Sequence, residues 1–204
     1  DYSGDFDPSF QLEDLGHRAL QAVSQEACVQ AHLLARSLLL NIDQRHGEDA
    51  ARELGRRVWI ATAGLAAHRL ARCIEFGDTI EDVATLFQLH PHFFPRPYVD
   101  LSVEVVDERT ARIAIGDCPA LREADHHSWF ASLSAEPHPA LDLIAGVVNP
   151  RARCRSGEAA NGGFAWEIVI DPAADPMVEP KDMNFARMTR GFYFKLMQRK
   201  PLRR

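Results

Sequence analysis

The hydrophobic pattern of this sequence changes its period at a proline-rich segment, residues 90–97. Ahead of that segment apolar residues recur at helical spacing, and beyond it they alternate with polar residues as they do in strands. The three prolines of the segment exclude a helix and favour extended backbone. We therefore predict a rigid connector between a helical half, residues 1–97, and a strand half, residues 98–171, of a single domain.

Two long helices are predicted in the first half of the chain. One covers residues 10–45, which contain no proline, and the other covers residues 48–75. The middle of the second helix, residues 61–67, consists almost entirely of small side chains. Small side chains let another backbone approach closely, so this helix is expected at the centre of the helical layer. The alternative is that Gly64 leaves room for a ligand.

The second half of the chain predicts two β-hairpins joined through a helix. Apolar and polar residues alternate over residues 99–105 and 111–115. The pattern returns in residues 164–170, after a strand at 152–156, and a helix at 140–148 connects the two hairpins. The expected fold is therefore α+β, with an N-terminal helical layer packed on a C-terminal four-stranded antiparallel sheet.

Composition and charge narrow the classes of function. A net charge of -6 and a pI near 5.8 argue against nucleic-acid binding, which depends on a basic surface. The sequence has no secretory leader and no apolar stretch near the roughly 20 residues of a membrane-spanning helix, so a cytoplasmic protein is expected. No C-x-x-C pair, Walker A, dinucleotide-binding, zincin or serine-hydrolase motif is present. Residues 172–204 are interpreted as a linker and a basic C-terminal tail.

The densest group of reactive side chains follows the end of a predicted strand. A thiol, two imidazoles and two carboxylates fall within eleven positions there. A Cys beside a His can form an activated nucleophile, and Cys and His with one Asp can instead bind zinc or another transition metal. The simplest alternative is a solvated loop with a buried thiol and exposed histidines. The candidate catalytic residues are Cys118, His127, His126, Asp117 and Asp125.

A second group of candidates centres on the proline-rich connector. In extended backbone His90 and His92 point to the same side, so both imidazoles can converge on one site, although an ordinary connector is the alternative. Tryptophans are expected in the core or in a pocket wall. A lone histidine in an apolar helix, such as His32 or His68, is more often hydrogen-bonded within the core. The candidate ligand-binding residues are His90, His92, Phe93, Trp129, Trp59 and His68.

The order of elements and motifs resembles a known family over residues 33–170. Asp117-Cys118-Pro119 ends the first hairpin, and Asn149-Pro150 ends the helix that follows. A basic strand with Cys154 then leads into a hairpin containing Trp166. This layout resembles the L-2-amino-thiazoline-4-carboxylic acid hydrolase-like proteins and is similar in outline to 4-vinyl-reductase-type ligand-binding domains. The hydrolase resemblance implies ring-opening hydrolysis of a small cyclic amidine or thiazoline, with Cys118 as the first residue to test.

Two functions are therefore expected, and neither assigns a cofactor. The first is a small-molecule enzyme that hydrolyses a C–N bond in a small cyclic substrate, with Cys118 as nucleophile or ligand. His126 or His127 would be its base, and Asp117 or Asp125 would orient that base. The second is a non-catalytic subunit that binds a small ligand or assembles with a partner, with a zinc or transition metal on His or Cys as an option. A homo-oligomer is expected, and the C-terminal tail can dock on a partner.

Overall fold

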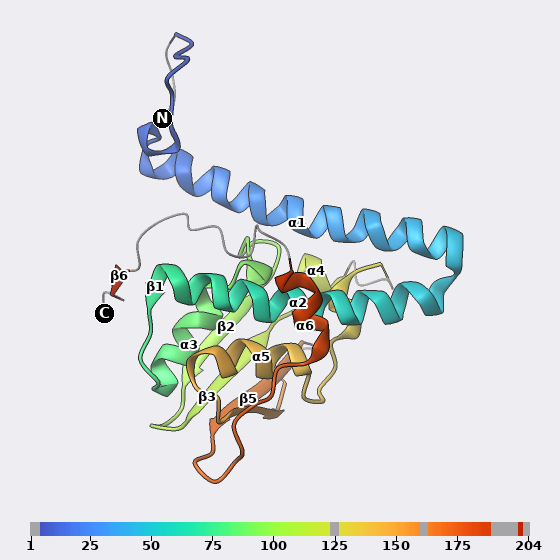
Figure 1. Cartoon of the computed structure of the whole chain (residues 1–204), viewed down its shortest axis with the longest axis vertical. Coiled ribbons are helices and arrows are strands. Elements are labelled where there is room, and N and C mark those ends of the chain that lie inside the picture. The colour runs from blue at the N-terminus through green and yellow to red at the C-terminus, as the bar shows by residue number, and fades with distance from the viewer. Residues whose placement is uncertain (1–4, 123–126, 160–162, 189–199, 202–204) are drawn as a thin grey trace.

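Helices form the first half of the chain and a four-stranded antiparallel sheet dominates the second (Figure 1). The computed structural model describes residues 5–122, 127–159, 163–188 and 200–201. The predicted α+β fold is confirmed, because N-terminal helices pack with a sheet made of two hairpins that are linked through a helix.

Two long helices run antiparallel at one side of the molecule (Figure 1). They are α1 (His17–His46) and α2 (Glu48–Cys73), and the chain reverses between them at Gly47. Gly47 has φ +87°, a conformation that residues with a side chain rarely adopt. The first helix begins later than the sequence pattern predicts, because a short 3-10 turn, η1 (Leu12–Asp14), precedes it.

Helix α2 lies at the centre of the helical layer. It packs against α1 on one side and, on others, against α5 (Pro139–Val148) and α6 (Lys181–Arg187). A side chain at Gly64 would place its Cβ 2.7 Å from Sδ of Met183, a residue of α6. The small residues in the middle of α2 therefore serve helix packing, which is the first of the two interpretations that the sequence allowed.

The sheet has the strand order β2-β3-β5-β4, and all neighbouring strands are antiparallel. The predicted hairpins are β2 with β3 and β4 with β5, and the pairing of β3 with β5 joins them. Helix α3 (Ile80–Leu89) packs on β2 and β3, and α5 packs on β4. The strands are β2 (Leu101–Val105), β3 (Thr110–Ile115), β4 (Ala152–Ser156) and β5 (Phe164–Ile170).

The solvent side of the sheet carries a row of alternating charges. In register across the four strands, Glu104 faces Arg112, Arg112 faces Glu167, and Glu167 faces Arg155. Opposite charges on directly facing residues stabilise a strand pair by about 0.2–1 kcal/mol, whereas like charges destabilise it. This row therefore favours the observed register over one shifted by a residue.

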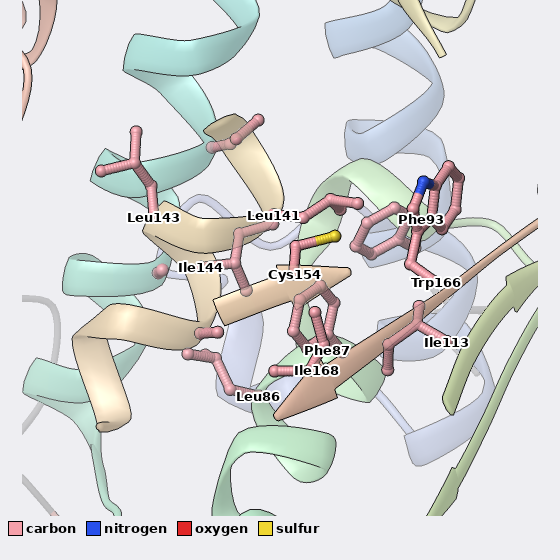
Figure 2. Packing of buried hydrophobic residues seen from close by; sticks show 14 of the residues in the cluster. Leu86, Phe87, Phe93, Ile113, Leu141, Leu143, Ile144, Cys154, Trp166 and Ile168 are labelled. Atoms are coloured by element: carbon pink, nitrogen blue, oxygen red, sulfur yellow. The ribbon is translucent and has the colours of Figure 1, made fainter. Parts of the chain in front are cut away.

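The hydrophobic core fills the space between the inner face of the sheet and helices α2, α3 and α5. Figure 2 shows Phe87 of α3 grouped with Cys154 and Ile168 of the sheet, and with Ile144 of α5. Trp166 is fully buried, and its Nε1 donates to the Ser134 and Glu136 carbonyls. Burial of a large apolar side chain contributes about 1.5–3 kcal/mol, so these contacts hold the sheet to the helices.

The connecting segments contain short helical turns, including one where the sequence pattern predicts extended backbone. The proline-rich connector contains a 3-10 turn, η2 (Pro91–Phe93), and its Phe94–Pro95 peptide bond is cis. Further along lie α4 (Pro119–Arg122) and a second 3-10 turn, η3 (Trp129–Ser132). Near the C-terminus, β6 (Lys200–Pro201) pairs in parallel with β1 (Ile74–Glu75).

None of the helices in the described part of the chain combines the length and apolar character that crossing a membrane requires.

Candidate functional site

A cavity of about 330 Å³ lies between α1 and α2. Its wall is mostly apolar, and its polar residues include two histidines, His32 of α1 and His92 of η2. The remaining lining residues come from the same two helices and from the start of η2. They are Cys28, Ala31, Leu34, Ala35, Leu38, Leu39, Gly55, Val58, Trp59, Thr62 and Pro91.

Short side chains on one face of α1 help to leave the cavity open. Within α1, which the structure describes throughout, Leu39 is the one fully buried side chain, and it closes over Gly55 of α2. Toward the N-terminus of α1, the lining positions hold Cys28, Ala31 and Ala35, at spacings of three and four residues. Residues at these spacings share a helix face, so a stripe of short side chains faces α2 and leaves space beside Trp59.

The imidazoles beside the cavity are held in place by backbone hydrogen bonds. His32 Nε2 lies 3.0 Å from the Phe94 carbonyl oxygen. Behind His92 is the fully buried His90, whose Nε2 lies 3.0 Å from the Ala63 carbonyl and whose Nδ1 accepts from the His92 amide. The rings of His90 and His92 lie 4.9 Å apart, but the backbone between them turns instead of being extended, and of the two only His92 lines the cavity.

Burial keeps these imidazoles uncharged at neutral pH. It lowers the pKa of His90 to about 4, against the opposing effect of the hydrogen bond to Ala63. It also lowers the pKa of His92 well below its ordinary value, and charge on His90 or His32 would lower it further. The pKa of His32 is lowered by burial as well. The polar end of the cavity therefore offers neutral hydrogen-bonding groups rather than cations.

A smaller cavity, of about 200 Å³, lies on another side of α1. It shares His32 and Ala35 with the larger cavity, and its other residues are more polar. His127 Nε2 lies 2.9 Å from the carboxylate of Asp43 on α1. The cavity is lined by Val29, His32, Leu33, Ala35, Arg36, Tyr98, His127 and Ser128.

The structure gives the predicted catalytic residues separate surroundings. Cys118 is part of the hydrophobic core, with 2% of its surface exposed. Asp117 lies at the surface, where a hydrogen bond from Arg122, at 2.7 Å, lowers the pKa of its carboxyl. His127 is paired with Asp43 instead. The remaining two candidates, Asp125 and His126, lie outside the described residues.

The other predicted ligand residues have three kinds of environment. Trp59 lines the larger cavity and contacts His138, with the two rings tilted by 39° and their centroids 4.0 Å apart. Phe93 is buried in the core behind that cavity. His68 Nε2 lies 2.7 Å from Glu179, and both contact Arg187 of α6, so this group fastens α6 to α2. The backbone of Trp129 is in η3, and its side chain lies outside the described part of the structure.

Two features of the site were not predicted from the sequence. Arg36 gives no specific signal in the sequence, because an arginine on a long helix is usually a solvated surface residue. The stripe of short residues on the first helix has the spacing of ordinary helix packing, so it does not by itself indicate a cavity. A pattern that could have marked it is the concentration of Cys28, Ala31 and Ala35 on the same face as His32.

Metal binding and thiol chemistry find little support in the described residues. Among them, no group of three or more His, Cys, Asp or Glu side chains is arranged to hold a metal ion. Burial raises the pKa of the Cys154 thiol to about 12, so it stays protonated at neutral pH. A protonated thiol is a poor nucleophile and a poor metal ligand.

Comparison of the chain with known proteins found no matching family model, no matching curated protein and no matching solved structure. The resemblance to the hydrolase-like proteins therefore stays a prediction from the sequence.

Proposed function

We propose that this protein binds a small apolar molecule in the cavity between α1 and α2. The observation that carries the proposal is the cavity itself, which measures about 330 Å³ and is walled by side chains such as Leu38, Val58 and Trp59. Small-molecule sites in proteins are commonly concave, largely apolar and furnished with a few polar groups, with volumes upward of about 300 Å³. The cavity has each of these properties.

The electrostatics of the wall favour an uncharged group inside this cavity. An apolar molecule gains roughly 25 cal/mol for each Å² of apolar surface that it removes from water. Burial of a charged group in the wall would oppose that gain, because removing the charge from water costs free energy. Here the histidines beside the cavity are kept neutral by burial, so they can hydrogen-bond a ligand without such an opposing cost.

The same observations weigh against the hydrolase hypothesis as the first choice. Its nucleophile, Cys118, packs in the core, and its candidate base, His127, is paired with Asp43. Hydrolysis of a small cyclic substrate stays a prediction, and Cys118→Ser tests it directly. If that variant folds and loses turnover of a thiazoline or cyclic amidine that the unaltered protein hydrolyses, the binding proposal is incomplete.

A cavity-filling substitution tests the binding proposal. Ala31 lines the larger cavity, so Ala31→Trp should occupy it. Ala22 lies on the same helix and is exposed, which makes Ala22→Trp a matched control. The probe is Nile red, an uncharged dye that fluoresces in apolar surroundings.

We expect saturable dye binding by the unaltered protein. Ala31→Trp should weaken it at least about tenfold, which corresponds to about 1.4 kcal/mol, and Ala22→Trp should leave it unchanged. The absence of saturable binding, or equal weakening by the two substitutions, contradicts the proposal. Thermal melting of each variant confirms that the helices are still folded.

A further inference from the structure

The two cavities adjoin each other beneath α1. His32 and Ala35 line both, and because they are three residues apart they are neighbours on one helix face. The His32 ring is fixed by its hydrogen bond to the Phe94 carbonyl and by contact with the rings of Tyr98 and Phe130. His32 and Ala35 thus lie at the boundary between the two cavities, and Ala35, which ends in a methyl group, fills little of the space there.

The two cavities differ in polarity. The larger one offers apolar side chains and neutral imidazoles. The smaller one adds the guanidinium of Arg36, the imidazole of His127 and the Ser128 hydroxyl. An arginine side chain is charged at every physiological pH. The lining thus changes from apolar in the larger cavity to partly cationic in the smaller one, across the boundary formed by His32 and Ala35.

We infer that the ligand is an amphipathic carboxylic acid, with its hydrocarbon part between α1 and α2 and its carboxylate on Arg36 in the smaller cavity. This inference rests on the proposed function, because it needs the larger cavity to bind an apolar group. A guanidinium matches a carboxylate in shape and can bond both of its oxygens. It also has five N–H donors, so Arg36 can bind the ligand and keep a contact within the protein.

The charges around the smaller cavity discriminate among head groups. Among the described residues, Asp43 contributes a carboxylate beside this cavity, and Nε2 of His127 lies 2.9 Å from it. An ammonium head group would approach the Arg36 cation and is disfavoured by like-charge repulsion. A hydroxyl head group would form a hydrogen bond without the added strength of an ionic one. The expected order of affinity is therefore carboxylate, then alcohol, then amine.

Three ligands with the same chain and different head groups test this order on the whole protein. Octanoate, octanol and octylamine are each titrated against bound Nile red at neutral pH. We expect octanoate to displace the dye at a concentration about tenfold lower than octanol, since a charge-assisted hydrogen bond contributes more than a neutral one. Arg36→Gln should remove most of that preference by weakening the binding of octanoate far more than that of octanol, and Arg36→Lys should restore part of it.

The control is Arg18→Gln, which removes the same charge from an exposed position of α1. It should keep the preference for octanoate. Equal affinity for octanoate and octanol, or a preference that survives Arg36→Gln, overturns the inference while the proposed function stands. If neither the dye nor any of the three ligands binds, the proposed function itself is wrong. Should Arg36→Gln fail to fold, the order of the three ligands on the unaltered protein still decides.

Discussion

The layer around the sheet and the layer formed by α1 are built on opposite principles. Between the sheet and its helices, large side chains such as Phe87 and Trp166 interlock and are fully buried. On α1, by contrast, Leu34 lines the larger cavity and keeps 73% of its surface exposed, and short side chains such as Ala31 and Ala35 line the same cavity. One region uses its apolar residues to hold the fold together, and the other leaves an apolar space unfilled. If the proposed function is correct, stability and ligand binding depend on different layers of the molecule.

The test with the largest expected effect removes one apolar side chain from each layer. Trp166→Ala should lower the free energy of unfolding by about 3–5 kcal/mol, because it opens a cavity in the core and leaves two carbonyls without their donor. Leu34→Ala, at a largely exposed position of α1 in the wall of the larger cavity, should change it by less than about 0.5 kcal/mol. Urea denaturation measures both. Similar losses from the two substitutions would show that α1 is packed as firmly as the sheet.

A second test uses the buried histidine that lies between the two layers. The pKa of His90 is about 4 in the folded protein, below the usual 6.5 of an unfolded chain. The unfolded state therefore binds the proton more readily than the folded state. The contribution of His90 to the free energy of unfolding is fully present above pH 6.5 and decreases as the pH falls toward 4. The loss from this one residue should reach about 3 kcal/mol near pH 4.

His90→Gln should remove most of that pH-dependent loss, because an amide can still donate to the Ala63 carbonyl but does not titrate. The control is His46→Gln, at the exposed end of α1, which should leave the loss intact. Unfolding free energies measured between pH 7 and pH 4 compare the two. A His90→Gln variant as acid-sensitive as the control would place the source of the acid sensitivity elsewhere.

A third test asks how α6 is held on α2, on the other side of the helical layer. Glu179 is bonded by His68 and Arg187; burial raises the pKa of its carboxyl, but these two partners more than offset that effect, so the net pKa is lowered. Glu179→Gln should cost about 1 kcal/mol and speed amide hydrogen exchange in α6 while the sheet stays protected. Glu53→Gln, which breaks an exposed pair with Arg56, should cost less than about 0.5 kcal/mol. Exchange that accelerates equally in the sheet would contradict the local role.

The sequence predicts the well-packed layer much better than the loose one. Alternation in the strands defines which residues face the core, so both hairpins and the helix between them follow from the pattern. The Cys118 cluster illustrates the limit, because proximity along the chain does not fix side-chain direction. The thiol of Cys118 is buried in the core, and His127 contacts Asp43, a residue 84 positions away in the sequence. Long-range partners of this kind leave no local signal.

The smallest effect on stability is expected from a substitution at Ala35, which lines both cavities and so tests stability and binding together. Ala35→Leu should fill part of the space beneath α1 and raise the free energy of unfolding by about 0.5–1 kcal/mol, as cavity-filling substitutions commonly do. It should at the same time weaken Nile red binding, because the added side chain occupies part of the larger cavity, which Ala35 lines. Denaturation and dye titration on one variant measure the two effects together. If Ala35→Leu instead destabilises the protein, the space under α1 is already well packed, and the contrast between the layers does not extend to this helix.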